Sequence, residues 1–228
     1  MEQFIIPAPS RITLGVNNTD KVFPVRRIYC VGRNYADHIR EMGNDERDPP
    51  FFFQKPADAI LPSGSDFPYP PLSEDVHHEI ELVVAIGKGG TSITQASALD
   101  HVFGYGVGID MTRRDLQADA KEMRRPWEIG KAFDHAAPCS LISPATEIGH
   151  PDKGRIWLSI NGTIKQDGDL AQQIWGVPET IWHLSQSVTL VPGDLIMTGT
   201  PAGVGPIRRS DVISGGIENV GDIEIRVV

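Results

Sequence analysis

Two glutamates stand two positions apart in residues 77–84, HHEIELVV. Alternate side chains of a β-strand point to the same face, which puts Glu79 and Glu81 on one face and Ile80 and Leu82 on the other. Neighbours on one face are about 6.5 to 7 Å apart at the backbone, so both carboxylates can lean onto one cation. The alternative is a half-exposed strand with two solvated glutamates, since acidic residues usually lie on the surface.

A third carboxylate closes the segment 103–111, FGYGVGIDM. Large apolar residues alternate there with Gly104, Gly106 and Gly108, and Asp110 follows on the same face. Three glycines in register indicate that something approaches the backbone closely on that face. A carboxylate in so apolar a stretch needs a partner, because burying an unpaired charge is costly. The competing interpretation is that Asp110 caps a helix over residues 112–116.

Together, Glu79, Glu81 and Asp110 predict an all-oxygen site for a hard cation, lying in a cavity that the missing side chains leave open. Carboxylate oxygens suit Mg²⁺ or Mn²⁺, and Ca²⁺ is a further candidate. The sequence has no cysteine or paired-histidine spacing that would indicate zinc or iron.

His38 and Glu41 lie three residues apart, so on a helix they share a face and the carboxylate can orient the imidazole. Histidine titrates near neutrality, and a neighbouring carboxylate raises its proton affinity. This pair is therefore a candidate general base for activating water. A surface histidine held in a salt bridge is the alternative.

Lys131 and a glycine-rich loop are weaker candidates. Apolar and aromatic residues flank Lys131, so a buried ammonium that stabilises an enolate or oxyanion is one interpretation and a solvated surface lysine is the other. The loop 198–205, TGTPAGVG, follows an expected strand, and its backbone donors with a threonine hydroxyl can hold a carboxylate. It lacks the lysine-serine ending of a phosphate loop, and a plain tight turn competes with this interpretation.

The elements that must position these residues are mainly strands, because 23 glycines and 18 prolines divide the chain into short alternating segments. The clearest is a hairpin with strands 156–160 and 163–165 around Asn161-Gly162, a dipeptide typical of tight two-residue turns. Residues 188–190 and 195–197 are expected to form a second strand pair around a turn at 192–194. Residues 223–227 alternate as a last strand.

Helices are expected in the minority, over residues 35–42, 94–100, 113–123 and 178–186. The proline-rich passage 62–71 is expected to be an ordered loop. We find no internal repeat and no flexible linker, and 228 residues with 40% hydrophobic content fit one compact domain.

Composition narrows the classes of partner. A formal net charge of −9 disfavours nucleic acid and anionic membrane surfaces, and every apolar run is too short for a membrane helix. Two cysteines and an N-terminus without a secretory signal predict a soluble, cytoplasmic protein. An anionic substrate must then be held by local charge, for which the arginine pairs 113–114 and 124–125 are candidates.

The order and the sequences of these segments resemble the fumarylacetoacetate hydrolase superfamily from residue 27 to residue 228. Residues 1–26 are then a short N-terminal extension. The motifs that carry the resemblance are VGRNYADHIREMG from Val31, FFFQKP from Phe51, HHEIELVVAIGK from His77, GYGVGIDMTRRDLQ from Gly104, WEIGKAFD from Trp127 and GDLIMTGTPAGVG from Gly193. Longer members carry a separate N-terminal domain that these residues do not match, so no role of that domain is transferred.

The resemblance implies an α+β, mostly β fold: a mixed β-sandwich roll with short peripheral helices, usually homodimeric. It implies Mg²⁺ or Mn²⁺ bound through Glu79, Glu81 and Asp110, and it places His38 and Glu41 on a lid helix over the substrate. It further implies that Lys131 faces the metal-bound oxygens and that Thr200, beside Gly199, holds the substrate carboxylate. The residues that match positions near the pocket, with less defined roles, are Arg33, Lys55, Arg114 and Gln117.

The implied activity is metal-dependent hydrolysis of a carbon-carbon bond in a 2,4-dioxo acid. The segments FPVRRIYC from Phe23 and RPWEIGK from Arg125 resemble the fumarylpyruvate hydrolase branch of the family, which acts in gentisate breakdown. This resemblance predicts fumarate and pyruvate as the products. The rivals are a general acylpyruvase or oxaloacetate decarboxylase, an isomerase of unsaturated dioxo acids, and a silent protein that only binds small acids.

Overall fold

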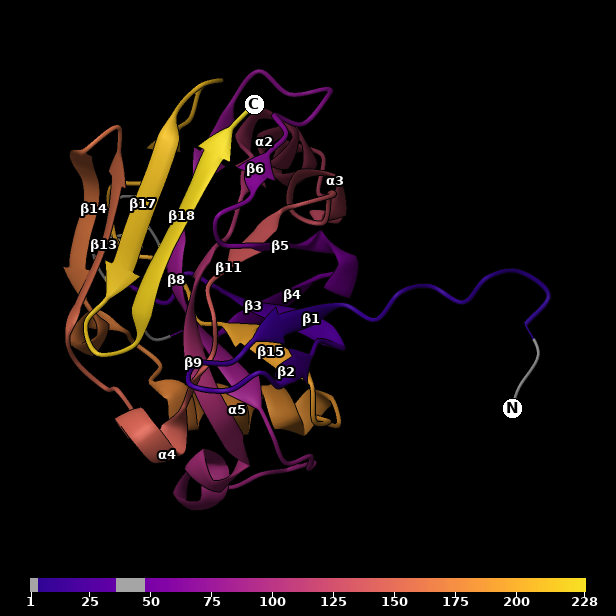
Figure 1. Cartoon of the computed structure of the whole chain (residues 1–228), viewed down its shortest axis with the longest axis vertical. Helices are drawn as coiled ribbons and strands as arrows, with labels where there is room; N and C mark the ends of the chain where they lie inside the picture. The colour runs from indigo at the N-terminus through magenta and orange to yellow at the C-terminus, as the bar shows by residue number, and fades with distance from the viewer. Residues whose placement is uncertain (1–3, 36–47) are drawn as a thin grey trace.

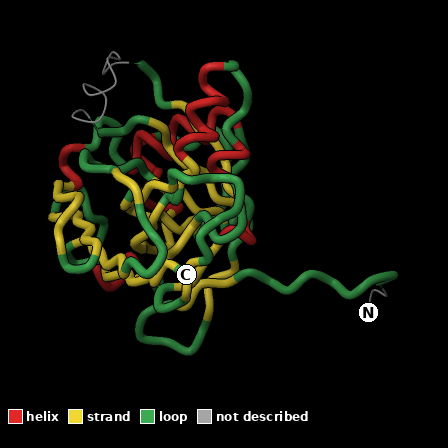
Figure 2. The backbone as a smooth tube through the Cα atoms, turned by 90° about the horizontal axis from the view of Figure 1, so that it is seen from above, coloured by secondary structure: helices red, strands yellow, loops and turns green. Residues whose placement is uncertain are grey.

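The computed structural model describes residues 4–35 and 48–228. Strands dominate it, in two main sheets that lie face to face, with helices at the periphery (Figure 1). This α+β, mostly β architecture agrees with the expected fold class. Residues 4–12 extend away from the body before the first strand, as both views show (Figures 1 and 2).

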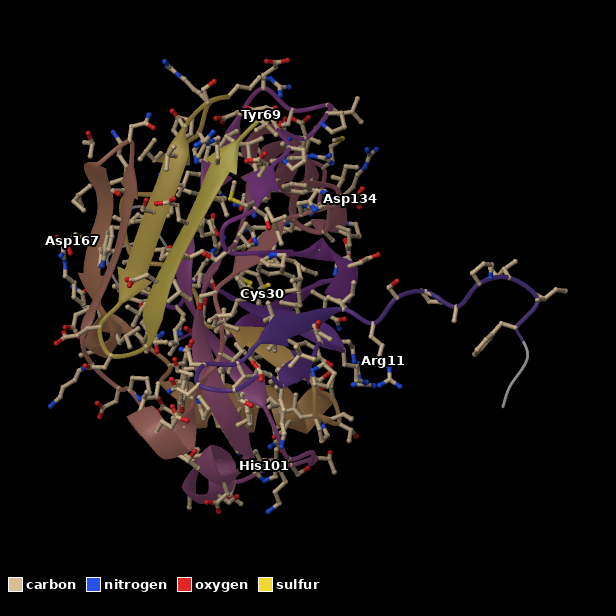
Figure 3. All side chains as sticks on the ribbon, viewed as in Figure 1. Arg11, Cys30, Tyr69, His101, Asp134 and Asp167 are labelled. Atoms are coloured by element: carbon tan, nitrogen blue, oxygen red, sulfur yellow. The ribbon has the colours of Figure 1, made fainter. Side chains whose placement is uncertain are left out.

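The larger sheet is mixed and follows the order β4-β3-β15-β8-β9-β11-β5, with β12 paired to β9. Every residue of β8 is buried, because the sheet is covered on both faces. The strands are β3 (Arg27–Gly32), β4 (Phe51–Lys55), β5 (Ile60–Pro62), β8 (Ile80–Ile86), β9 (Val102–Ile109), β11 (Ala137–Cys139), β12 (Ser143–Pro144) and β15 (Asp194–Met197). The sheet encloses Cys30, which lies in the interior (Figure 3).

The second sheet has the order β14-β13-β17-β18-β6. Its hairpin confirms the expected turn, since Asn161 and Gly162 have φ of 50° and 79°, the positive values that a tight turn requires. The last strand is confirmed by its alternating buried residues. The strands are β6 (Asp66–Phe67), β13 (Arg155–Ile160), β14 (Thr163–Asp169), β17 (Val212–Ile217) and β18 (Gly221–Val227).

Two small sheets complete the strand framework. One is the hairpin of β1 (Thr13–Gly15) and β2 (Val22–Pro24), which buries Leu14 and Phe23 in the core. The other joins β7 (Val76–His78) to β10 (Thr112–Arg113) on one side and to β16 (Gly205–Pro206) on the other. This three-stranded sheet brings the start of β8 close to the end of β9.

Two of the expected helices are confirmed, as α2 (Arg114–Glu122) and α5 (Val177–Ser187). Residues 94–100 form a 3-10 helix, η2 (Gln95–His101), in place of the expected α-helix. The expected helix over residues 35–42 lies outside the described residues from position 36 onward. The remaining short helices are η1 (Ala57–Ala59), α3 (Glu128–Lys131), α4 (Ala145–Ile148) and η3 (Leu170–Gln172). No helix among residues 4–35 and 48–228 has the length and apolar content to cross a membrane.

The expected strand pair around residues 192–194 is wrong. Residues 195–197 do belong to a strand, β15, but it pairs in parallel with β3 and antiparallel with β8. Leu190 forms only an isolated bridge to Gly90. The turn at Gly193, with φ of 98°, therefore turns the chain into the middle of the large sheet without forming a hairpin.

Gly104, Gly106 and Gly108 of β9 are closely approached, as the sequence predicted. The groups that approach them are other residues of the protein and not a ligand. A Cβ on Gly106 would lie 3.0 Å from Cδ1 of Ile142, and one on Gly108 would lie 2.6 Å from Cγ2 of Val83. The expected open cavity along this face is therefore wrong. The glycines let the segment around Ile142 pack on the strand.

Candidate metal centre and pocket

The three predicted carboxylates converge at one point, with one oxygen from each of Glu79, Glu81 and Asp110 within 4.8 Å of the others. All three side chains are buried. Their meeting follows from strand register, because Ile80 of β8 is paired with Ile109 of β9. Glu79 just before β8 and Asp110 just after β9 are then neighbours, joined by a 2.8 Å hydrogen bond from the Asp110 amide to the Glu79 carbonyl oxygen.

The alternatives for these residues do not match the structure. Asp110 makes no cap, because α2 begins at Arg114 with no side-chain hydrogen bond at its N-terminus. Glu79 and Glu81 are 6% and 2% exposed, so they are not solvated acids on a half-exposed strand.

Two buried lysines neutralise this carboxylate cluster. Nζ of Lys131 lies 2.8 Å from Oε2 of Glu79 and 2.7 Å from Oδ2 of Asp110, and it donates to Oγ1 of Thr112 at 2.6 Å. Nζ of Lys55 lies 2.8 Å from Oδ1 of Asp110 and donates to the carbonyl oxygen of Met111 at 3.1 Å. Lys131 is thus a buried ammonium and not a solvated surface lysine. Lys55 contacts Asp110 from outside the pocket lining.

Arg114 completes the charge pattern at the first residue of α2. Its Nη2 contacts Glu79, and its Nη1 donates to Oε1 of Gln117 at 2.8 Å. One helical turn therefore holds a guanidinium and an amide against the carboxylate cluster.

The surroundings of the two glutamates shift the pKa values of their carboxyl groups in opposite directions. Burial raises the pKa of the Glu79 carboxyl, but the charges of Lys131 and Arg114 outweigh burial and hold that pKa well below its ordinary value. Burial raises the pKa of Glu81 well above its ordinary value, and the charges of Asp110 and Glu79 add to the rise. Burial lowers the pKa of Lys131, but Asp110 and Glu79 more than offset this and raise it. The pKa values of the two glutamates are therefore shifted in opposite directions, that of Glu79 down and that of Glu81 up.

The donor set fits a hard divalent cation. Three carboxylates supply oxygen ligands only, their atoms are close enough to share one ion, and no thiol or imidazole within the described residues joins them. Glu79, Glu81 and Asp110 can therefore hold a metal ion.

The glycine-rich loop after β15 contacts the cluster through its backbone. The Gly199 amide donates to Oε2 of Glu81 at 2.7 Å. Gly199 has φ of 93°, and a Cβ there would lie 2.8 Å from Cβ of Asn34, so the close approach requires glycine. Thr200, the next residue, lines the pocket above the carboxylates.

These residues enclose a pocket of about 40 Å³. A cavity needs roughly 10 to 15 Å³ for one water, so this one has room for an ion with a few waters. Its walls are both charged and aromatic. The lining residues are Val31, Gly32, Arg33, Asn34, Phe51, Phe53, Glu79, Glu81, Asp110, Arg114, Gln117, Lys121, Trp127, Lys131, Gly199 and Thr200.

Most of the predicted site residues that the structure describes meet in this pocket. The exceptions are Lys55, which is buried behind Asp110, and the candidate anion holders Arg124 and Arg125, which are exposed and outside the lining. His38 and Glu41 lie outside the described residues.

Lys121 and the aromatic wall of the pocket, formed by Phe51, Phe53 and Trp127, are not among the site residues predicted from the sequence. Lys121 follows Gln117 by four residues and Arg114 by seven, so the helical period already puts the three on one face. Its ammonium lies 5.0 Å from the ring centroid of Trp127, and the Trp127 ring meets Phe51 edge-on at 5.2 Å. The aromatic residues carried no separate sequence signal, because any of them also suits a core.

Comparison with known proteins identifies relatives over almost the whole chain. The profile of the family described as fumarylacetoacetate (FAA) hydrolase C-terminal matches residues 27–228. The crystal structure of fumarylpyruvate hydrolase from Pseudomonas aeruginosa in complex with Mn²⁺ and pyruvate is 50% identical. It superposes with a TM-score of 0.97, and the match covers 99% of each chain.

Two curated relatives carry other names. Oxaloacetate tautomerase FAHD1 of Mus musculus, a mitochondrial protein, is 42% identical over 89% of this chain and 91% of its own length. The mitochondrial oxaloacetate decarboxylase of Dictyostelium discoideum is 45% identical over 84% of this chain and 88% of its own length.

Proposed function

Because the chain belongs to the fumarylacetoacetate hydrolase family, we propose that it hydrolyses fumarylpyruvate to fumarate and pyruvate. The observation that carries this proposal is the 50% identity, over 99% of both chains, to a fumarylpyruvate hydrolase whose structure holds Mn²⁺ and pyruvate. The buried carboxylate cluster with cationic side chains around it supports the same chemistry, because a dioxo acid is an anion that chelates hard cations.

We assign Glu79, Glu81 and Asp110 as ligands of Mg²⁺ or Mn²⁺, with Ca²⁺ as a weaker candidate. The bound ion would supply a Lewis acid that polarises the 2-oxo group of the substrate. The lysines keep the carboxylates in place, Lys55 from beneath Asp110 and Lys131 from the pocket side.

The substrate carboxylate is assigned to the loop after β15, where Gly199 and Thr200 line the pocket. Arg33, Arg114 and Gln117 also line the pocket and are assigned to the remaining oxygens of the substrate.

The base is assigned to His38, oriented by Glu41. In the proposed reaction His38 takes a proton from water, and the hydroxide oxygen bonds to the distal carbonyl carbon of the dioxo acid. The bond between that carbon and the pyruvate methylene carbon then breaks, and its electron pair passes into the enolate of pyruvate. The Lys131 ammonium stabilises this enolate, which takes up a proton at carbon to give pyruvate.

The second candidate is an oxaloacetate tautomerase or decarboxylase, favoured by the two curated relatives at 42% and 45% identity. Oxaloacetate is also a dicarboxylate with a 2-oxo group, so the same cluster and the same lysine would act on it. Decarboxylation requires no hydrolytic water, and tautomerisation leaves the mass unchanged.

Product analysis separates these activities. The protein is incubated with fumarylpyruvate, acetylpyruvate or oxaloacetate in Mn²⁺ and in chelator, and products are separated by mass. We expect fumarate and pyruvate in equal amounts, dependence on the metal, and a preference for fumarylpyruvate over acetylpyruvate. Release of carbon dioxide from oxaloacetate with no cleavage of fumarylpyruvate would overturn the proposal, as would an isomer of unchanged mass or oxalate binding without any turnover.

The proposal extends to the setting of the enzyme. We propose a cytoplasmic homodimer that acts in the breakdown of gentisate. Sedimentation equilibrium of the purified chain tests the assembly, and a mass of one chain at micromolar concentration would contradict it.

A further inference from the structure

Gln166 lies on β14, in the sheet that does not contain the carboxylate cluster, yet its side chain accepts a hydrogen bond from the amide of Ile80, the residue between Glu79 and Glu81. It is completely buried, although both neighbours, Lys165 and Asp167, are exposed. Asp167 marks the outer side of this strand (Figure 3). A glutamine among exposed hairpin residues gives no sequence signal for a functional site.

All four hydrogen-bonding positions of the Gln166 amide are used, by partners in residues 78–80 and 200–201. Nε2 donates to Oγ1 of Thr200 at 2.7 Å and to the carbonyl oxygen of Pro201 at 2.8 Å. Oε1 accepts from the Ile80 amide at 3.0 Å and lies 2.9 Å from Nδ1 of His78. The Pro201 carbonyl can only accept and the Ile80 amide can only donate, so the positions of the nitrogen and the oxygen of the Gln166 amide are fixed.

This orientation decides what the Thr200 hydroxyl can do. A hydroxyl has one hydrogen to donate, and here its oxygen already accepts from Gln166. Within residues 4–35 and 48–228, no acceptor takes the Thr200 hydrogen, while Thr200 lines the pocket. The hydroxyl is therefore left as a donor toward the pocket, as a bound carboxylate requires.

The same amide also holds the backbone between two carboxylates. Ile80 separates Glu79 from Glu81, and its amide donates to Oε1 of Gln166. One side chain thus ties the strand that carries the glutamates to the loop that carries Thr200.

We propose that Gln166 is a positioning residue for the bound 2-oxo acid, acting through Thr200. By donating to the Thr200 oxygen it makes the hydroxyl a dedicated donor to the carboxylate of the ligand. The inference rests on the proposed function only in that the ligand is a 2-oxo acid, and it names the residue that sets the binding geometry.

An ordinary buried amide would contribute stability alone, so the test compares pyruvate binding with folding. Four variants are made: Gln166→Met, Thr200→Val, Thr200→Ser and the double variant Gln166→Met with Thr200→Val. Lys165→Met, an exposed neighbour on the same strand, is the matched control. Pyruvate affinity is measured by calorimetry in saturating Mn²⁺, and thermal melts are recorded for each variant.

We expect Gln166→Met and Thr200→Val each to weaken pyruvate binding about tenfold, since each weakens or removes a hydrogen bond to the charged carboxylate of the ligand. The double variant should bind within about twofold of Thr200→Val, because both changes act on the same hydrogen bond, the one from the Thr200 hydroxyl to the ligand. Lys165→Met should bind as the unchanged protein does, and Thr200→Ser, which keeps the hydroxyl, should lose less affinity than Thr200→Val. If Gln166→Met does not fold, Gln166→Glu keeps the acceptor oxygen and removes the donor, and the same loss of affinity is expected.

Multiplying effects in the double variant, or a lower melting temperature with unchanged pyruvate affinity, would overturn the inference. So would a protein that binds no pyruvate in Mn²⁺. Pyruvate binding with the expected non-additivity but without fumarylpyruvate hydrolysis would overturn the proposed function and leave the role of Gln166 standing.

Discussion

Nζ of Lys55 lies 2.8 Å from Oδ1 of Asp110, and both side chains are shielded from solvent. Breaking a buried ion pair from one side leaves an uncompensated charge and costs about 3 to 5 kcal/mol. Lys131 still contacts Asp110, so we expect Lys55→Met to lose about 3 kcal/mol of unfolding free energy in chelator, measured by urea unfolding. Lys88→Met, at an exposed lysine, is the control. Equal stability of the two variants would contradict the pairing.

Metal binding is expected to release a proton from Glu81. Burial and the charges of Asp110 and Glu79 raise the pKa of this carboxyl in the metal-free protein, whereas a metal ligand must be ionised. Because the folded pKa is above the unfolded value, Glu81 stabilises the metal-free fold at low pH, and this contribution is lost as pH rises through the folded pKa. Metal binding has the opposite dependence, so the rise in melting temperature caused by Mg²⁺ should grow with pH.

Calorimetry of Mn²⁺ binding in two buffers of different ionisation enthalpy measures the released protons. We expect the unchanged protein to release protons when it binds Mn²⁺, and Glu81→Gln to release fewer. Glu79→Ala and Asp110→Ala should show no stabilisation by Mg²⁺ at all. An affinity that does not change between pH 6 and pH 8 would exclude a protonated ligand.

His38→Ala tests the assigned base. Loss of a general base typically lowers the rate by about 10² to 10⁴. We expect kcat for fumarylpyruvate to fall within that range while pyruvate binding in Mn²⁺ stays unchanged. Glu41→Gln should fall less, because the imidazole remains. Full activity in His38→Ala would assign the base elsewhere.

Lys121 is expected to favour dianionic substrates. It lines the pocket on the same helical face as Arg114 and Gln117. Burial lowers its pKa, and the charges of Arg114, Arg33 and Lys131 add to this, so a second substrate carboxylate would meet a concentrated positive field. Lys121→Met should lower kcat/KM about tenfold for fumarylpyruvate, a loss expected for one charge-assisted hydrogen bond. A matching loss for the monoanion acetylpyruvate, or a similar loss in the exposed variant Lys153→Met, would contradict this role.

The carboxylate cluster was predictable because strand periodicity is local. The spacing of Glu79 and Glu81, and the position of Asp110 at the end of an apolar strand, already required that the acids share a face and a partner. What local pattern could not give was that Lys55, from a strand of the same sheet, lies beneath Asp110. That contact depends on the order of strands in the sheet, which no short segment encodes.

The wrong strand pair at residues 188–197 has the same cause. A strand, a turn and a strand suggest a hairpin, but β15 is buried between β3 and β8. The glycine row of β9 shows a related limit, since glycine indicates close approach and not what approaches. Gln166 had no signal, because its partners come from two other parts of the chain.

The parallel pairings of β15 with β3 and of β18 with β6 join early strands to late ones in both sheets. A nascent chain that has emerged only as far as β14 therefore lacks one inner strand of the large sheet, β15, and two inner strands of the other, β17 and β18. Such contacts between distant parts of a chain slow folding, since loops must close before the contacts form. During synthesis Glu81 would lack its hydrogen bond from the Gly199 amide until the residues after β15 are available, so this contact forms late in the folding of the protein.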